Sequence, residues 1–165
     1  MKIFYWAPWI GKVGTIKAVI NSADILEKYS KNSIQTKIID AVGEWNIYEK
    51  KNRYINLSRI KFHKYLPKGG FFNSRLSYLI IFFFSFISLL NLIKKEKPDF
   101  LIIQLITSLP IFLNFIFKFK TKVMLRISGY PKMNFLRTLF WKIASKKIYK
   151  ITFPTKSLYE QFKVL

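Results

Sequence analysis

An arginine at the end of an apolar segment is the residue of this sequence best suited to binding an anion. Arg126 lies near the end of 122–127, Lys-Val-Met-Leu-Arg-Ile, and is followed by Ser128 and Gly129. A charged side chain in an apolar strand requires a partner. A planar guanidinium can hold a carboxylate or a phosphate through two parallel hydrogen bonds. We therefore expect either a ligand anion at Arg126 or an ion pair with an acid that the fold brings near.

Two glycines, Gly11 and Gly14, follow the first apolar segment at 2–6 and precede a predicted helix. Glycine lets backbone N–H groups approach a phosphate closely, and the N-terminus of a helix favours negative charge. The full spacing of a dinucleotide-binding loop, G-x-G-x-x-G, is absent. The motif alone therefore favours an ordinary turn between a strand and a helix, and a phosphate loop is the alternative.

Arg137 and Trp141 lie four residues apart and share one face of a predicted helix. They are separate from the apolar stripe of that helix, which consists of Phe135, Leu139 and Ile143. A tryptophan beside basic residues suits a membrane interface. We expect Arg137 and Trp141 to face a membrane, with ordinary packing of an aromatic side chain as the alternative.

Several kinds of chemistry are excluded by composition. The chain has no cysteine, which rules out disulfides, thiolate catalysis and cysteine zinc sites. With one histidine, His63, and eight acidic residues, the chain has few metal ligands, and we expect no metal site. A lone histidine is more often a surface residue than a catalyst. No spacing typical of a glycosidase carboxylate pair is found among Asp24, Asp40, Glu44 and Asp99.

Apolar segments with strand character alternate with helical segments along most of the chain. The predicted strands lie at 2–6, 36–40, 100–104, 122–127 and 148–153. Strand–helix–strand units imply an α/β fold with an open, mostly parallel, Rossmann-like sheet and helices on both faces. The part from 43 to 70 is polar and irregular, with short strands expected at 54–57 and 60–65.

Parallel strands bring their carboxyl ends to one rim of the sheet, which is where ligands bind in open α/β folds. Small or polar residues follow several of the predicted strands. We expect the following residues at this rim: Gly11, Gly14, Gln104, Arg126, Ser128, Gly129 and Thr155.

The segment 76–93 is apolar and uncharged, with Arg75 before it and Lys94 and Lys95 after it. Its length and flanks meet the requirements for a membrane span. However, Pro98 and a predicted strand follow almost at once, as in a strand–helix–strand unit. The sequence therefore favours a crossover helix, with a membrane span as the alternative and a membrane-dipping helix face between the two.

The formal net charge is +21, and the stretch from Phe100 to Tyr159 contains no acid. Such a charge attracts polyanions, either nucleic acid or the anionic face of a membrane. A coding bias towards A/T-rich codons is the alternative source of the many lysines. The N-terminus has no secretory signal pattern, so we expect a cytoplasmic protein.

Several segments of the second half resemble glycosyltransferase family 4, in particular bacterial members that build O-antigen, capsule and other surface polysaccharides. The resemblance is strongest over 98–155. The "K-P-D" sequence before a central strand is common in that family, and the "L-R-I-S-G-x-P" block resembles one subset. The similar segments are 97–104, Lys-Pro-Asp-Phe-Leu-Ile-Ile-Gln; 107–110, Thr-Ser-Leu-Pro; 119–131, which includes Leu-Arg-Ile-Ser-Gly-Tyr-Pro; 136–141, Leu-Arg-Thr-Leu-Phe-Trp; and Pro154-Thr155.

This resemblance implies a GT-B fold, in which two Rossmann-like domains face a cleft. Residues 1–165 would be the N-terminal, acceptor-side domain, and the C-terminal nucleotide-sugar-binding domain with its pair of glutamates would be absent. The implied activity is metal-independent, retaining sugar transfer from a nucleotide-sugar to a lipid-linked glycan, without a cofactor. We expect this chain alone to be inactive, and we expect it at the inner face of the plasma membrane as a peripheral protein.

The resemblance also assigns roles at the cleft. Gly11 and Gly14 match the loop that approaches the donor phosphate. The sequence departs from the family because it lacks adjacent glycines there and has Gln104 where relatives often have histidine, so no catalytic residue is assigned. The residues that the resemblance implies on the acceptor side of the cleft are Gln104, Arg126, Ser128, Gly129 and Thr155.

Two other functions stay open from the sequence. A basic nucleic-acid-binding module would explain the charge, although the basic residues are scattered and no binding motif is present. An integral membrane protein with a span at 76–93 would explain the apolar segment.

Overall fold

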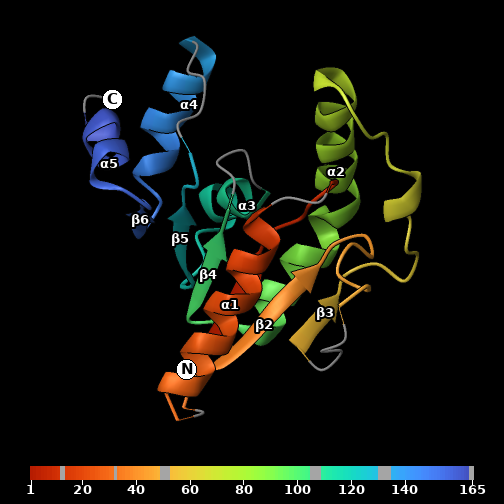
Figure 1. The fold of residues 1–165 in the computed structure, drawn as a ribbon, viewed down its shortest axis with the longest axis horizontal. Coiled ribbons are helices and arrows are strands. Elements are labelled where there is room, and N and C mark those ends of the chain that lie inside the picture. Colours follow the sequence, from red (N-terminus) through yellow and green to blue (C-terminus); the bar gives the residue numbers. More distant parts are fainter. Residues whose placement is uncertain (12–13, 32, 49–52, 105–108, 130–134, 164–165) are drawn as a thin grey trace.

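Six parallel strands form one sheet in the order β3-β2-β1-β4-β5-β6 (Figure 1). The computed structural model describes residues 1–11, 14–31, 33–48, 53–104, 109–129 and 135–163. The strands are β1 (Lys2–Trp6), β2 (Gln35–Asp40), β3 (Tyr54–Asn56), β4 (Phe100–Ile103), β5 (Lys122–Arg126) and β6 (Lys150–Thr152). The helices are α1 (Gly14–Tyr29), α2 (Phe71–Glu96), α3 (Leu109–Phe117), α4 (Phe135–Ser145) and α5 (Lys156–Lys163), with a short 3₁₀ helix at His63–Tyr65. The predicted open parallel sheet is confirmed.

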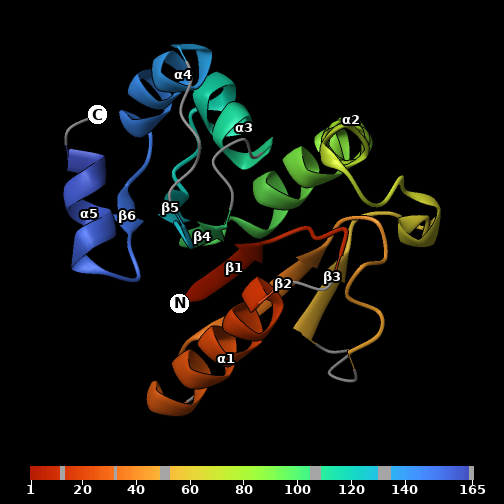
Figure 2. The same ribbon diagram turned by 45° about the horizontal axis from the view of Figure 1, so that its top comes forward.

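The strand order reverses between β1 and β4, which is the arrangement of a Rossmann-type sheet. β1 is the first strand in the sequence and lies in the middle of the sheet, with β2 on one side and β4 on the other. The helices that follow β1 and β4, α1 and α3, accordingly lie on opposite faces of the sheet (Figure 2), and in open α/β sheets ligands bind beyond the carboxyl ends of the strands at such a reversal.

Helices cover both faces of the sheet, as the sequence predicted. Figure 2 shows α1 on one side of the sheet and α2 and α3 on the other. The alternation of side chains along β1 divides the core in the same way. Ile3 and Tyr5 belong to the cluster under α1, whereas Phe4 and Trp6 belong to the cluster under α2 and α3.

The segment 60–65 is not a strand, contrary to prediction. Its residues alternate apolar and polar like a half-buried strand, but β3 already forms the edge of the sheet. The backbone N–H of His63 instead donates to the carbonyl of Val42 (3.0 Å). This bond and the burial of Leu66 fasten the segment as a short 3₁₀ turn beside the carboxyl end of β2.

The helix α2 connects β3 to β4 and is longer than the predicted segment at each end. Lys97, with φ of 45°, ends the helix in the left-handed conformation, and its N–H donates to the carbonyl of Ile93 (3.0 Å). Within the described residues it is the one helix long and apolar enough to cross a membrane, with a mean hydropathy of 2.3, yet both of its ends lead into strands of the same sheet. Only 28% of its apolar window is buried.

Candidate functional site

The carboxyl ends of β1 and β4, where the strand order reverses, are the candidate site. Trp6 at the end of β1 pairs with Ile103 at the end of β4. The N–H of Gln104 donates to the carbonyl of Trp6 (3.4 Å), so Gln104 is held directly beside the end of β1.

Gln104 has the most notable side chain at this point. It is 6% exposed, and its amide nitrogen has no hydrogen-bond partner in the described part of the chain. A buried donor left unpaired costs about 1–3 kcal/mol. The structure therefore places a donor that needs an acceptor at the reversal of strand order, as expected for Gln104 by position. Residues 105–108, which follow it, lie outside the described residues.

Arg126 is the last residue of β5 and pairs with Thr152 of β6. It is half-buried, and no acid in the described ranges forms an ion pair with it. Burial raises the pKa of Tyr5, and the positive charge of Arg126 partly offsets this rise. The guanidinium charge therefore acts on the α1 side of the sheet, where the Tyr5 hydroxyl bonds Ser22 Oγ at 2.9 Å. An ion pair between Arg126 and a described acid, one of the two expected outcomes, is not formed.

Ser128 and Gly129 leave β5 exposed at the same rim. The N–H of Ile127 still donates to the carbonyl of Thr152 (3.0 Å), so regular pairing with β6 ends just before them. Both residues thus follow the strand where the sequence predicted. Residues 130–134 lie outside the described part.

The space around the backbone does not require glycine at either position of the predicted phosphate loop. A Cβ atom at Gly11 or Gly14 would meet no atom within 4 Å. Gly14 is the first residue of α1 and Gly11 is exposed. The N-terminus of α1 is thus open on the side of these residues, while residues 12–13 are not described. The role of this loop in binding a phosphate stays a prediction.

Thr155 caps a helix. Its Oγ1 accepts the backbone N–H of Leu158 (3.2 Å), which satisfies one of the free N–H groups of the first turn of α5. The threonine follows β6 and is exposed. Its position just after a strand agrees with the prediction. The contact that the structure shows for its side chain is the cap of α5.

The expectation that Trp141 faces a membrane is wrong. Trp141 is 5% exposed, and its ring packs against Phe162 of α5 with ring centroids 5.2 Å apart. The apolar stripe of the same helix, Phe135, Leu139 and Ile143, is instead exposed. α4 has this orientation because α5 packs against the side of the helix that carries Trp141. Arg137 lies in α4, but its side chain is outside what the structure describes.

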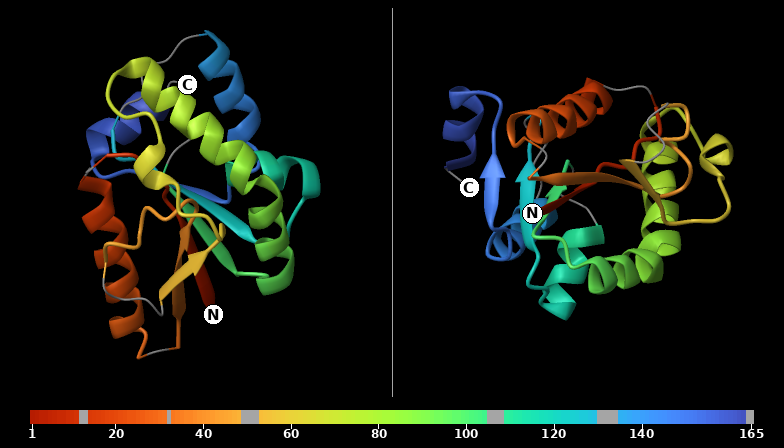
Figure 3. Two further views of the ribbon diagram at one scale, coloured as in Figure 1. Left: turned by 90° about the vertical axis from the view of Figure 1, so that its right-hand side faces the viewer. Right: turned by 90° about the horizontal axis from the view of Figure 1, so that it is seen from below.

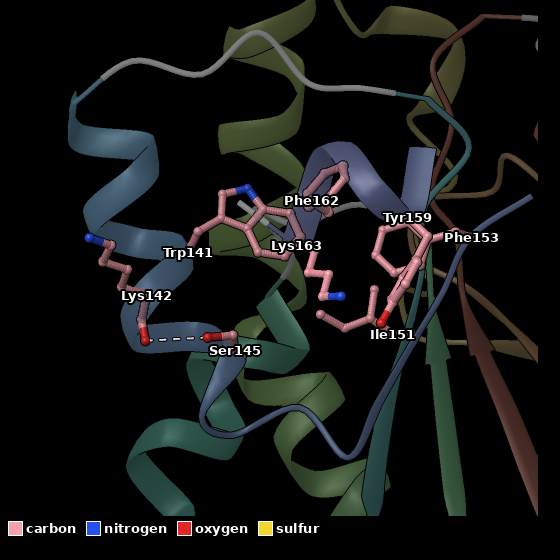
Figure 4. Close-up of a pocket in the computed structure, with 8 residues that line it drawn as sticks. All are labelled: Trp141, Lys142, Ser145, Ile151, Phe153, Tyr159, Phe162 and Lys163. Atoms are coloured by element: carbon pink, nitrogen blue, oxygen red, sulfur yellow. Dashed lines mark hydrogen bonds between the residues drawn. The ribbon is translucent and has the colours of Figure 1, made fainter. Parts of the chain in front are cut away.

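Trp141 lines a pocket of about 370 Å³ between α4, β6 and α5 (Figure 4). Aromatic side chains form half of its lining, and Figure 4 shows the long side chain of Lys163 among them. The pocket is lined by Trp141, Lys142, Ser145, Ile151, Phe153, Tyr159, Phe162 and Lys163.

A buried pair of acids at the end of β2 was missed. Asp40 and Glu44 are each 1% exposed. The carboxylate of Glu44 accepts the N–H groups of Ala41 (3.1 Å) and Val42 (2.8 Å). Asp40 Oδ1 accepts the N–H of Gly43 (2.8 Å), whose φ of 95° allows the tight turn between the two acids.

His63 lies close to Asp40 and is half-buried, between the surface position that its residue type favours and the interior. Its ring lies 4.8 Å from the ring of Trp9, and its Nε2 is buried without a partner among the described residues. Burial, together with the charge of Lys68, lowers the pKa of His63, so the imidazole is neutral at neutral pH. In the sequence, the one signal for the Asp40–Glu44 pair was the presence of two acids four residues apart at the end of a predicted strand. The same pattern is typical of an ordinary surface turn.

In the described ranges, no group of three or more acidic or histidine side chains is arranged to hold a metal ion. The candidate residues Gln104, Arg126 and Ser128 offer an amide, a guanidinium and a hydroxyl, which are hydrogen-bonding groups. In comparisons with known proteins, no family model and no curated protein matched the chain.

Proposed function

We propose that this chain is the acceptor-side part of a glycosyltransferase that moves a sugar from a nucleotide-sugar to a lipid-linked glycan during surface-polysaccharide synthesis. The reaction would take place at the inner face of the plasma membrane and use no metal. The observation that carries the proposal is the unpaired, buried amide of Gln104 at the point where strand order reverses.

The chemistry of the rim supports an acceptor with hydroxyl and phosphate groups. Gln104 offers a buried N–H donor that is unpaired among the described residues. Arg126 offers a guanidinium without an ion pair among the described acids, and Ser128 adds an exposed hydroxyl. A saccharide hydroxyl accepts from an amide, and a diphosphate accepts from an arginine fork. A glycan carried on a lipid diphosphate has both kinds of acceptor.

The sequence resemblance supports the same proposal from a separate direction. It assigns the acceptor to the front domain of a GT-B enzyme and the nucleotide-sugar to the other domain. The segments that carry it include β4 and β5, two of the strands whose carboxyl ends form this rim.

A binding experiment tests this proposal without requiring turnover. The purified chain in detergent micelles is titrated with a polyprenyl diphosphate that carries a saccharide, and with the same lipid lacking the saccharide. Tighter binding of the saccharide-bearing lipid is expected. Gln104→Leu, which keeps the volume and removes the amide, should weaken that binding roughly five- to hundredfold.

Gln35→Leu is the matched control, because Gln35 is an exposed glutamine at the opposite end of the sheet. It should leave the affinity unchanged. Equal affinity for the lipid with and without saccharide, or equal losses in Gln104→Leu and Gln35→Leu, would contradict the proposal.

A further inference from the structure

One side of α2 is both apolar and exposed. Phe72, Leu76, Leu79, Phe83 and Ile87 recur at intervals of three or four residues and so lie on one face of the helix. They are 83%, 50%, 55%, 71% and 68% exposed, respectively. At 1.5 Å per residue this stripe is about 22 Å long. The opposite face, with Ile81, Leu89 and Ile93, is buried on the sheet.

The stripe continues onto α3. The ring of Phe112 lies 5.6 Å from that of Phe82 and 6.2 Å from that of Phe86, so the two helices are in contact along their apolar sides. Figure 3 shows α2 and α3 together on the side of the sheet away from α1. The exposed residues of both helices are called here the α2–α3 face: Phe72, Leu76, Leu79, Phe83, Ile87, Phe112, Phe115 and Ile116.

Lysines gather at one end of this face. Lys94, on the last turn of α2, holds its Nζ 5.0 Å from the ring centre of Phe117 at the end of α3. Beside it, at the amino ends of β4 and β5, lies a hollow of about 660 Å³. It is called here the lysine hollow, after the lysines that line it: Lys94, Lys97, Lys118, Lys120 and Lys122.

The acids near the lysine hollow are already engaged. Asp99 lines it, and its Oδ2 accepts the N–H of Lys2 (2.7 Å). Glu96 forms an ion pair with the Lys2 ammonium at 3.2 Å. Five lysines therefore face one carboxylate, and the hollow has a surplus of positive charge that suits phosphate groups.

We propose that the α2–α3 face lies in the interfacial layer of an anionic bilayer, with lipid phosphates at the lysine hollow. This inference rests on the proposed function for the choice of a membrane as partner, and it identifies the surface and the lipid charge. An amphipathic surface with aromatic and aliphatic side chains on one side and lysines at its border is the pattern of interfacial membrane binding. Protein interfaces, in contrast, are depleted in lysine.

The proposal fixes the orientation of the sheet on the membrane. Because α2 returns the chain from the carboxyl end of β3 to the amino end of β4, Phe72 lies on the side of the rim and Lys94 on the opposite side. With the stripe flat on the bilayer, α2 and α3 lie between the sheet and the membrane (Figure 3).

Vesicle binding tests the proposal. The full chain is incubated with vesicles of phosphatidylcholine alone or with added phosphatidylglycerol, and bound protein is separated by flotation. Binding that requires phosphatidylglycerol is expected. Phe83→Ser with Ile87→Ser should reduce partitioning at least tenfold, and Lys118→Gln with Lys120→Gln by roughly twentyfold at low salt, at about fivefold per lysine.

Matched controls are available on α1, on the other side of the sheet. Ile25→Ser with Tyr29→Ser changes two exposed apolar residues, at 52% and 79% exposure, and should bind like the wild type. Lys28→Gln with Lys31→Gln serves the same purpose for the lysines. Unchanged circular-dichroism melting of every variant separates lost binding from lost folding.

A tryptophan introduced at position 83 reports the location directly. Phe83→Trp should show a blue shift of its fluorescence with phosphatidylglycerol vesicles, whereas Ile25→Trp should show none. The proposal would be overturned by equal fluorescence shifts at both positions or by equal vesicle binding of all variants. It would also be overturned if the protein bound duplex DNA and no vesicles, or if it bound vesicles of phosphatidylcholine alone. The vesicles contain no saccharide, so this result and that of the acceptor titration are independent.

Discussion

Asp40 and Glu44 hold their carboxyl groups within hydrogen-bonding reach of each other in the interior of the protein. Burial raises the pKa of Glu44 well above its usual range, and the neighbouring carboxyl of Asp40 raises it further. A proton held between the two groups would also satisfy Asp40 Oδ2, which is buried and unpaired among the described residues. The loop after β2 is thus held by a pair of acids that keeps a proton at pH values where a surface carboxyl has lost it.

The raised pKa of Glu44 predicts that stability declines with rising pH. In the unfolded chain the Glu44 carboxyl ionises near its ordinary value of 4.5, while the native group keeps its proton. The free energy of unfolding should therefore fall from that pH upwards until the native group ionises, by about 1.4 kcal/mol per unit of pKa difference. Urea unfolding between about pH 5 and pH 8 measures this slope.

Asp40→Asn should make the decline shallower and raise the stability near neutral pH by about 1–2 kcal/mol. The amide nitrogen can donate to Glu44 and no longer repels its charge, while the amide oxygen can still accept from Gly43. Glu160→Gln, at an exposed acid, should leave the slope unchanged. A slope that persists in Asp40→Asn with lower stability would mean that the pair carries no shared proton.

A second prediction concerns the attachment of β3 to α1. Arg53, directly before β3, forms ion pairs with Asp24 and Glu27 on α1, and its side chain is only 13% exposed. Arg53→Met should lower the free energy of unfolding by about 1–3 kcal/mol, between the values for exposed and buried pairs. Arg59→Met, at an exposed arginine, should change it by less than about 0.5 kcal/mol.

The same variant should change the response to acid. Burial alone would raise the pKa of Glu27, but hydrogen bonds from Thr36 and the charge of Arg53 outweigh it and lower that pKa. The stabilisation from Glu27 is present above 4.5 and is lost as the pH falls through the lowered native value. Arg53→Met should reduce this acid-linked loss. Identical acid unfolding curves for wild type and variant would assign the depression to Thr36 alone.

A third prediction uses the single histidine of the chain. His63 should titrate below 6.5, because burial and the charge of Lys68 disfavour the imidazolium. Stability linked to His63 is complete above that pH and is lost as the pH falls towards the native pKa, because the unfolded chain takes up the proton first. Since the chain has one histidine, its imidazole proton resonances give the pKa without assignment.

Lys68→Gln should raise the pKa of His63 towards its ordinary value, and Lys28→Gln on α1 should leave it unchanged. A His63 that titrates at or above 6.5 in the wild type would be inconsistent with a half-buried ring beside Trp9.

The fourth prediction separates a binding role of Arg126 from a structural one. Arg126→Lys keeps the charge and removes the planar fork. If the guanidinium binds the diphosphate of a lipid-linked saccharide, the dissociation constant should rise by the equivalent of roughly 1–3 kcal/mol, with an unchanged melting temperature. The control is Arg59→Lys. A lower melting temperature with an unchanged dissociation constant would make Arg126 part of the scaffold.

The sequence was sufficient to predict the sheet, because its central strands are apolar segments with strong strand character. β1, β4 and β5 appear at nearly the predicted residues. The part from 43 to 70 was predicted poorly, since its shape depends on contacts that alternation does not encode. The bond from His63 to Val42 decides the turn there, and the two residues are 21 positions apart.

The sequence predicted where the candidate site residues lie along their strands better than it predicted which side chains they contact. Gln104, Arg126, Ser128 and Gly129 follow their strands as expected, because parallel strands share one rim. The direction of Trp141 was not predictable, since the helix had two plausible apolar sides and α5 decided between them. The Asp40–Glu44 pair was missed because its chemistry comes from burial, which the spacing of residues along the chain does not encode.

The position of β1 in the sheet has a consequence for how the protein is made. β1 pairs with β2 early, but its other edge waits for β4, whose first residue is almost a hundred positions downstream. A ribosome therefore releases the whole of α2 before that edge is filled. During this interval the nascent chain exposes an unpaired strand and a long apolar helix together, which is a hazard for aggregation. Pairing across such a sequence separation is also slow. The yield of folded protein during expression should therefore depend on how well α2 is protected from aggregation until β4 has been synthesised.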